Sequence, residues 1–287
     1  MEKQKANILK FKEMKQQGKK ITMVTAYDFA MMSQVDKSDI DMILVGDSAA
    51  MTMMGYEGTV QINLDTMLVF CQAVANAGKH TFLVGDMPFM TYEISTEQAM
   101  TNAGRIIREG RMDAVKLEGG ERMADTVTAI VRAGIPVMGH IGLTPQSAAQ
   151  LGGFNVQGKK LQDAKQIVKD ALALEKAGAF AIVLEAIPSP VAKIITESVQ
   201  VPTIGIGAGN KCDGQVLVIH DLLGLFDRFI PKFVKRYANL GADMQKALNT
   251  YSAEVREGIF PDKEHSFTMP QDLLQQLTAE LQEEGIL

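Results

Sequence analysis

Short apolar runs rich in β-branched residues recur along the chain, and most of them end in a glycine or a charged residue. Runs of this kind between turn signals are typical of buried strands. We predict eight strands from them, at residues 21–26, 42–45, 81–84, 114–117, 136–138, 180–184, 202–206 and 216–219.

The segments between these strands carry helical patterns with their own start and stop signals. A capping box begins at Ser95, before a helix over 99–109, and Gly178 ends an amphipathic pattern over 163–177. Similar patterns span residues 65–77, 121–133 and 190–198. Strands that alternate with helices favour a parallel sheet, and the count of eight favours a closed (β/α)8 TIM barrel over an open doubly wound sheet. The connection over 208–215 is too short for a full helix, so we expect an irregular step there.

Further helical patterns lie on both sides of the predicted barrel. Residues 1–20 contain an N-terminal helix over 4–17, and residues 240–287 form a C-terminal helical extension with helices over 240–257 and from Pro270 onward. One side of the last helix carries Leu273, Leu274, Leu277 and Leu281. This stripe could pack on its own barrel or on a neighbouring subunit. We therefore expect residues 1–287 to form a single α/β domain, a (β/α)8 barrel with an N-terminal helix and extra C-terminal helices.

The composition mainly excludes certain classes of protein and partner. With 287 residues, 46% of them hydrophobic, the chain can bury a large core as one barrel. A formal net charge of −5 argues against nucleic acid as a partner. No apolar run has the length of a membrane span or the pattern of a signal peptide. Cys71 and Cys212 show neither metal-ligand nor disulfide spacing, so we expect reduced core thiols in a cytoplasmic protein.

The most informative stretch is residues 113–120, where a short strand ends in Lys116, Glu118 and two glycines. The two-residue period of a strand places Lys116 and Glu118 on one face, although a surface pair of this kind would contribute less than about 1 kcal/mol. Other predicted strands also end in charged residues, and the C-terminal strand ends of a TIM barrel form its active face. The residues expected to meet there are Asp47, Asp86, Lys116, Glu118, His140, Glu185 and His220.

Each of these residues has an ordinary explanation when taken alone, because an aspartate after glycine is often a turn or cap residue and a buried histidine is often only hydrogen-bonded. Four carboxylates at one mouth are different, since like charges repel unless a cation lies among them. Carboxylate oxygens without cysteine favour a hard ion, Mg²⁺ above all, and disfavour zinc. Lys116 could offset the remaining negative charge or hold an anionic substrate.

Longer motifs carry a resemblance to a known family. They are TAYD at 25–28, VGDS at 45–48, DMPFM at 86–90, VKLEGG at 115–120, GHIGLTPQS at 139–147, GIGAGN at 205–210 and EHSF at 264–267. With these motifs in order over roughly residues 20–267, the chain resembles the ketopantoate hydroxymethyltransferase family. The resemblance implies a TIM barrel, a Mg²⁺ cofactor and a homo-oligomer, usually a decamer of two pentameric rings.

The resemblance also implies a role for each matching residue. The metal ligands would be Asp47, Asp86 and Glu118, and the keto-acid contacts would be Asp47, Ser48, Asp86 and Lys116. Glu185 would be the catalytic base, and His140 is a candidate for a residue that contacts the metal ligands without binding the metal itself.

The implied reaction transfers a hydroxymethyl group from the cosubstrate 5,10-methylenetetrahydrofolate to 3-methyl-2-oxobutanoate, and it gives ketopantoate in pantothenate and coenzyme A biosynthesis. A 2-keto acid that chelates Mg²⁺ has an acidic C3 hydrogen, so proton removal by Glu185 would give a Mg²⁺-stabilised enolate. The expected partners are therefore a small 2-keto acid, folate and further copies of the chain, with no nucleic acid and no membrane.

Two other interpretations stay open on the residues alone. A Mg²⁺-dependent barrel lyase or mutase acting on phosphoenolpyruvate-like or isocitrate-like acids would use similar carboxylates, although the chain has no Cys-Gly-His-like loop. The glycines between Gly205 and Gly209 could indicate a dinucleotide-binding module, but their spacing differs from a GxGxxG motif.

Overall fold

The structure, a computed structural model, describes residues 5–287, so the part of the expected N-terminal helix in residues 1–4 lies outside it. The chain divides into two compact units, one that ends at Ala238 and one that spans Asn239–Leu287. All of the predicted site residues precede Ala238, so the first unit positions the candidate site.

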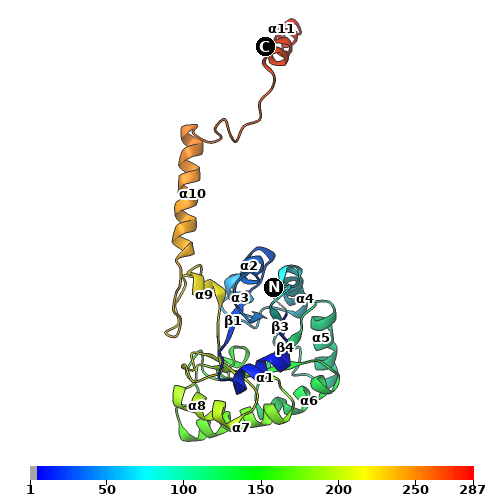
Figure 1. The fold of residues 1–287 in the computed structure, drawn as a ribbon, viewed down its shortest axis with the longest axis vertical. Helices are drawn as coiled ribbons and strands as arrows, with labels where there is room; N and C mark the ends of the chain where they lie inside the picture. Colours follow the sequence, from blue (N-terminus) through cyan, green and yellow to red (C-terminus); the bar gives the residue numbers. More distant parts are fainter. Residues whose placement is uncertain (1–4) are drawn as a thin grey trace. The chain divides into compact units, whose positions relative to one another are not determined.

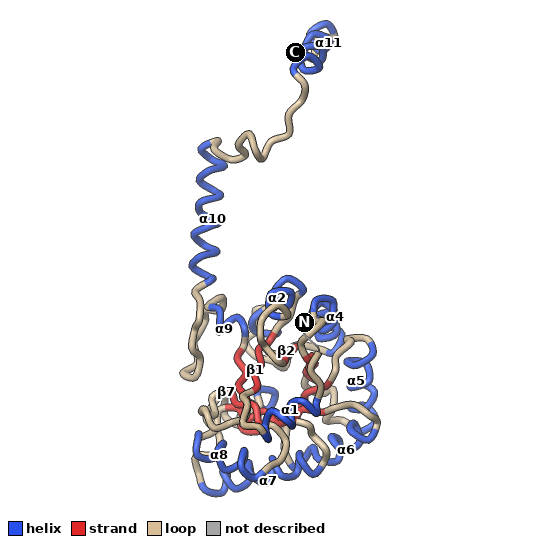
Figure 2. Tube along the Cα trace, viewed as in Figure 1, coloured by secondary structure: helices blue, strands red, loops and turns tan. Residues whose placement is uncertain are grey.

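The first unit is a closed barrel of parallel strands that pair in chain order, with the last strand hydrogen-bonded to the first. The strands are β1 (Ile21–Thr25), β2 (Met42–Val45), β3 (Phe82–Asp86), β4 (Ala114–Glu118), β5 (Val137–Gly142), β6 (Ala181–Glu185), β7 (Thr203–Ile206) and β8 (Gly214–Leu217). The predicted TIM barrel is therefore confirmed, and Figure 2 shows its strands with helices around them.

Helices follow most of the strands and cover the outside of the barrel (Figure 1). The helices of the first unit are α1 (Ile8–Gln16), which precedes the strands, and α2 (Phe29–Val35), α3 (Ala49–Thr52), α4 (Leu64–Ala77), α5 (Thr96–Arg108), α6 (Ala124–Arg132), α7 (Leu161–Lys176), α8 (Ser189–Ser198) and α9 (Ile219–Leu223), with short 3₁₀ turns η1 (Glu121–Met123) and η2 (Pro145–Ser147). The pattern of apolar residues does not predict α2, α3 and α9, because each is too short to show a clear helical period.

The last strand begins two residues earlier than predicted, at Gly214 in place of residue 216, and residues 219–223 are helical. Gly214 pairs with both Ile21 of β1 and Ile204 of β7. A Cβ at this position would lie 2.5 Å from the Ile21 carbonyl oxygen, so glycine is what allows the barrel to close here. The apolar pattern misses this residue because glycine carries no hydrophobic signal.

The connection between β7 and β8 contains no helix, as the pattern predicts for this segment. Dinucleotide binding to a glycine-rich loop depends on a helix N-terminus that follows the loop and faces the pyrophosphate. The glycines between Gly205 and Gly209 lead into β8 and not into a helix, which argues against the dinucleotide-binding interpretation.

The N-terminal helix α1 closes the end of the barrel opposite the predicted site. Phe11 is fully buried, and its ring lies edge-on to Phe82 at 5.3 Å between centroids. Lys15 Nζ lies 2.9 Å from Asp213 Oδ2 and also donates to two backbone carbonyls. The helix therefore contributes to the interior core, although its other lysines lie at the surface.

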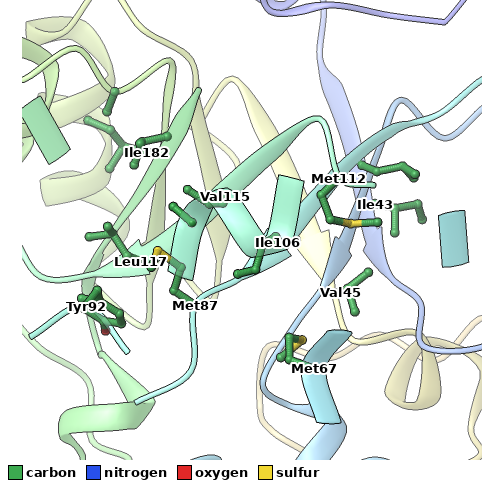
Figure 3. Packing of buried hydrophobic residues seen from close by; sticks show 14 of the residues in the cluster. Ile43, Val45, Met67, Met87, Tyr92, Ile106, Met112, Val115, Leu117 and Ile182 are labelled. Atoms are coloured by element: carbon green, nitrogen blue, oxygen red, sulfur yellow. The ribbon is translucent and has the colours of Figure 1, made fainter. Parts of the chain in front are cut away.

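A second apolar cluster fills the space between the strands and the outer helices. Figure 3 shows Val45 and Val115 from the strands, together with Met67 and Ile106 from α4 and α5. Outward-facing strand residues bury their side chains here, which leaves the inward-facing residues to form the barrel interior. Both cysteines are free and buried, as predicted.

The second unit contains α10 (Leu240–Glu257) and α11 (Gln271–Glu283), close to the helices predicted there. Neither helix contains a buried residue, and Leu274 of the apolar stripe is 51% exposed. Within residues 5–287, none of the helices has both the length and the apolar character that a membrane crossing needs.

Candidate active site

The inward-facing residues of several strands change from apolar to charged at the C-terminal end of the barrel. Val84 of β3 belongs to the interior cluster, and the two-residue period then places Asp86 on the same face. The same alternation brings Lys116 and Glu118 of β4, and Glu185 of β6, to the inner face. A charged layer therefore lies on top of the apolar interior, at the face where TIM barrels carry their active sites.

The register of the strands pairs these charges between neighbours. Asp86 is level with Lys116 in the β3–β4 ladder, and Glu118 is level with His140 in the β4–β5 ladder. Lys116 Nζ lies 2.8 Å from Asp86 Oδ1, and the two side chains are 4% and 1% exposed. Lys116 and Glu118 share a face as predicted, but they are buried and contact different partners, so the surface-pair explanation is wrong.

His140 connects two carboxylates that come from different strands. Its Nε2 lies 3.1 Å from Glu185 Oε2, and its Nδ1 lies 3.3 Å from Glu118 Oε1. Burial and the nearby Lys116 disfavour the imidazolium, but Glu118 and Glu185 outweigh them and raise the pKa of His140 to about 9. At neutral pH, His140 is therefore a buried cation between two carboxylates.

The site carries more negative than positive charge. In the buried charged layer the carboxylates are Asp47, Asp86, Glu118 and Glu185, and the cations are Lys116 and protonated His140. Four negative charges against two positive charges leave a formal excess of two. Burial, together with Asp47 and Glu118, raises the pKa of Asp86 to about 7 even though Lys116 opposes the change. The excess charge favours the binding of a cation.

Burial and the neighbouring charges also shift the pKa values of the other buried groups of this layer. Burial raises the pKa of Glu118, although His140 and Lys116 counteract this effect. Burial by itself would lower the pKa of Lys116, but the carboxylates around it, Asp86 first, raise it above its usual range. Lys116 is consequently a permanent cation at the centre of the site.

The loop after β2 supplies two more of the predicted residues. The backbone N–H of Asp47 donates to Asp86 Oδ2 at 3.1 Å, which ties the two aspartates together. Ser48 directly precedes α3, and its Oγ lies 2.8 Å from the hydroxyl oxygen of Tyr27. Burial raises the pKa of Tyr27 to about 12, so Ser48 has a neutral hydroxyl as its partner.

A cavity of about 870 Å³ opens above the charged layer. Its lining contains Asp47, Ser48, Asp86, Lys116, Glu118, His140 and Glu185, which are all of the site residues that the resemblance implies. Another part of the lining is apolar and includes Phe154, Val156, Phe226, Phe229 and Phe233. A cavity with one charged and one aromatic part suits a small anion next to a larger, flatter molecule.

His220 does not line the cavity, so the prediction that it joins the site is wrong. Because β8 ends at Leu217, His220 lies in α9 and not at a strand end. Its ring packs 5.5 Å from the ring of Tyr27, and burial lowers its pKa. The neighbouring residue, Asp221, lines the cavity instead.

Two residues that contact the proposed metal ligands were not predicted from the sequence. The side chain of Gln146 donates to Asp47 Oδ2 at 2.9 Å, and its backbone N–H donates to Glu118 Oε2 at 3.0 Å. Tyr92 in turn lies 2.6 Å from Gln146 Oε1. Gln146 lies in the GHIGLTPQS motif at 139–147, but neither the motif nor the residue type identifies its hydrogen-bond partners.

The carboxylates do not form a complete metal cage by themselves. In the part of the chain from residue 5 to 287, no group of three or more histidine, cysteine, aspartate or glutamate residues is arranged to hold a metal ion. Asp86 Oδ1 and Glu118 Oε1 are nevertheless buried carboxylate oxygens, and the cationic groups of Lys116 and His140 lie 2.8 Å and 3.3 Å from them. Carboxylate oxygens are the ligands that a hard divalent cation prefers, and such a cation can take its other ligands from water or substrate.

Comparisons with solved structures show the same kind of fold. Phosphonopyruvate hydrolase has a TM-score of 0.59 at 12% identity, with 96% of each chain covered. 2,3-Dimethylmalate lyase, described as a PEP mutase/isocitrate lyase superfamily member, has a TM-score of 0.57 at 16% identity, with 96% of this chain and 99% of the other covered. At these identities the likeness shows the fold alone, a TIM barrel of the kind found in that superfamily.

Comparisons of the sequence are more specific. A family model described as ketopantoate hydroxymethyltransferase matches residues 5–263. A 3-methyl-2-oxobutanoate hydroxymethyltransferase from Heliobacterium modesticaldum is 56% identical over 262 residues, which cover 91% of this chain and 95% of the relative. A relative with the same name from Moorella thermoacetica is 57% identical over 254 residues, or 88% and 94% of the two chains. The chain therefore belongs to the ketopantoate hydroxymethyltransferase family, which confirms the resemblance.

Proposed function

We propose that this protein converts 3-methyl-2-oxobutanoate into ketopantoate, with 5,10-methylenetetrahydrofolate as the one-carbon donor. The observation that carries the proposal is the buried layer in which Lys116 pairs with Asp86 and His140 lies between Glu118 and Glu185. The names of the relatives support hydroxymethyl transfer to the same keto acid. In the balanced reaction, the donor and a water molecule supply the hydroxymethyl group, the keto acid loses its C3 hydrogen, and tetrahydrofolate is released.

The oxygen donors of the site fit a hard divalent cation such as Mg²⁺. Asp47, Asp86 and Glu118 would hold it, because all three carboxylates line the cavity and the excess negative charge favours such an ion. Mg²⁺ commonly takes only one or two protein carboxylates and completes its shell with water and substrate oxygens, so a closed cage is not needed. When bound, the cation would withdraw electrons from the carboxylate and keto oxygens of the substrate and make the C3 hydrogen more acidic.

Lys116 is suited to hold the carboxylate of the keto acid. Its ammonium group has three N–H donors, and the contact with Asp86 uses one of them. Because the side chain is only 4% exposed, water screens its charge weakly. Ser48, which also lines the cavity, offers a hydroxyl group close to Asp47. Together these groups would orient the substrate in one direction.

Glu185 is the group best placed to take the C3 proton. Its side chain is 16% exposed, compared with 1% for Glu118, so a molecule in the cavity can reach it. His140 Nε2 lies 3.1 Å from Glu185 Oε2, and this contact would fix the orientation of the Glu185 carboxylate. The carbanion formed at C3 would then form the new carbon–carbon bond to the one-carbon unit, whose bonds to the two folate nitrogens are broken and whose hydroxyl oxygen comes from water.

The aromatic part of the cavity would bind the donor. Phe154, Phe226 and Phe233 line the cavity together with the charged layer, and flat heteroaromatic rings stack favourably on phenyl rings. This arrangement would place the one-carbon unit next to the keto acid. We further propose that the protein works as a homo-oligomer, with a decamer carried over from the family resemblance.

The test is product analysis with purified protein, 3-methyl-2-oxobutanoate, 5,10-methylenetetrahydrofolate and Mg²⁺. Ketopantoate should form, and its formation should stop when the donor is omitted or when EDTA removes the cation. Cleavage of a carbon–carbon bond in a larger 2-hydroxy acid, without any ketopantoate from the complete mixture, would favour a lyase and contradict the proposal.

A further inference from the structure

Gln146 is a buried residue whose side-chain amide is engaged at both ends. It is 5% exposed and lies in η2, in the connection between β5 and α7. Its Nε2 lies 2.9 Å from Asp47 Oδ2 and 3.0 Å from the carbonyl oxygen of Met87, while its Oε1 lies 2.6 Å from the Tyr92 hydroxyl. Its backbone N–H donates to Glu118 Oε2 at 3.0 Å.

These contacts allow one orientation of the amide. The Met87 carbonyl can only accept hydrogen bonds, so the group that faces it and Asp47 Oδ2 must be the NH2 of Gln146. The hydroxyl oxygen of Tyr92 accepts the backbone N–H of Glu118 at 3.3 Å, and its own hydrogen is then free to point at Gln146 Oε1. Tyr92 is 2% exposed, so little water competes for these bonds.

Gln146 thus occupies one oxygen on each of two proposed cation ligands. Asp47 Oδ2 and Glu118 Oε2 accept from it, whereas Glu118 Oε1 faces His140 Nδ1 at 3.3 Å. An amide carries no net charge, so it can orient a carboxylate without neutralising it, in contrast to the ion pair between Lys116 and Asp86.

We infer that Gln146, oriented by Tyr92, is a positioning residue for the divalent-cation site, and that it determines which oxygens of Asp47 and Glu118 are presented to the cation. The inference rests on the proposed function, because it requires that a cation binds there. Gln146 acts through the two carboxylates and needs no contact with substrate. Removal of a hydrogen-bond partner of metal ligands typically weakens metal binding about 10- to 100-fold.

The test is a titration of metal-free protein with Mn²⁺, followed by electron paramagnetic resonance, for the wild type and three variants. Gln146→Met keeps the length of the side chain and the backbone N–H but removes the amide, and it should weaken Mn²⁺ binding about 10- to 100-fold. Tyr92→Phe removes the group that orients the amide and should cause a smaller loss. The matched control is Ser147→Ala in the same turn, whose hydroxyl contacts Arg122 at 3.2 Å, and it should bind Mn²⁺ like the wild type.

A second measurement separates positioning from a direct part in the reaction. Exchange of the C3 hydrogen of 3-methyl-2-oxobutanoate with deuterated water is followed at increasing Mn²⁺ concentration. Gln146→Met should approach the wild-type rate once Mn²⁺ is saturating, because only cation binding is weakened. Glu185→Gln should stay slow at every Mn²⁺ concentration, because the proposed base itself is missing. Melting temperatures of the metal-free variants show whether each is folded.

The outcomes distinguish this inference from the proposed function. If the wild type binds Mn²⁺ and folded Gln146→Met binds it with the same affinity, the positioning role of Gln146 is overturned, the proposed cation site remains, and Gln146 only stabilises its loop. An equal loss in Ser147→Ala would also overturn it, since the loop and not the amide would then control binding. If the wild type bound no Mn²⁺, the proposed cation site would fail and the role of Gln146 with it. Should Gln146→Met not fold, unchanged affinity in Tyr92→Phe would overturn the inference.

Discussion

His140 should make the stability of the metal-free protein depend on pH between neutral and alkaline conditions. The proposed change is His140→Gln, which keeps a polar side chain but removes the titrating ring. In the folded protein, Lys116, Glu118 and Glu185 surround this ring, and the two carboxylates raise the pKa of His140 from 6.5 to about 9 despite burial. Replacement by a neutral amide should therefore remove a stabilising charge interaction.

The magnitude follows from the difference between the folded and unfolded pKa values. A raised pKa means that the folded protein binds the proton more tightly, so the stabilisation is fully present below pH 6.5 and is lost as the pH rises through about 9. About 2.5 pH units at about 1.4 kcal/mol each correspond to about 3.5 kcal/mol, most of which is lost between pH 6 and pH 10. The difference in unfolding free energy between wild type and His140→Gln should thus decrease by about 3 kcal/mol from pH 6 to pH 10.

The assay is urea unfolding in the presence of EDTA, at one protein concentration and at several pH values between 6 and 10. Fixed concentration matters because any subunit association adds to the apparent stability. The control is His265→Gln, since the His265 side chain is 59% exposed and its removal should cause no comparable change with pH. A difference between wild type and His140→Gln that stays constant across this range would show that His140 is neutral in the folded protein and would refute the reasoning.

Three further predictions concern the base, a close backbone approach and the helix that closes the barrel. Glu185→Gln should slow exchange of the C3 hydrogen about 10²- to 10⁴-fold in proton NMR in deuterated water, while calorimetry should show that the keto acid still binds. Unchanged exchange would show that Glu185 is not the base. Gly142→Ala should lower the unfolding free energy by about 2 kcal/mol or more, because φ is +94° and a Cβ would collide with the carbonyl oxygen of Glu185. The control Gly134→Ala has a similar φ of +88° but no atom within 4 Å of the new Cβ, so it should lower the unfolding free energy by only about 1 kcal/mol. Equal losses in the two variants would exclude the collision as the cause. Phe11→Ala should lower the unfolding free energy measured in urea by about 3–5 kcal/mol because the ring is fully buried, whereas Leu9→Ala in the same helix should change it by no more than about 0.5 kcal/mol because Leu9 is 66% exposed. If Phe11→Ala destabilised the protein as little as Leu9→Ala, α1 would not close the barrel.

The barrel was predictable because its signals are local. Apolar strands, helix caps and glycine stops are each visible within about ten residues, and their alternation leaves few possible topologies. The error at β8 has the opposite cause. Gly214 begins that strand because the chain must pass close to Ile21, which lies far away in sequence, and no local pattern records this contact.

The same distinction explains the candidate site. Lys116, Glu118 and Glu185 were predicted because each lies at a strand end, where position along the chain implies position in the barrel. Gln146 was missed because its partner Asp47 is 99 residues away and Gln146 itself lies in a loop. His220 was wrongly included, since it lies beyond the end of β8 and packs against Tyr27.

By itself, therefore, the sequence determined which faces of the strands are inward and which charged residues stand at their ends, because both follow from the two-residue period of a strand. Only the tertiary structure decided how those charges combine. Closure and register of the barrel bring Lys116 to Asp86 and place His140 between Glu118 and Glu185. Electrostatic interactions depend on distance and burial, which spacing along the chain does not contain, so the charge of His140 and the site's excess negative charge emerge only in the folded protein.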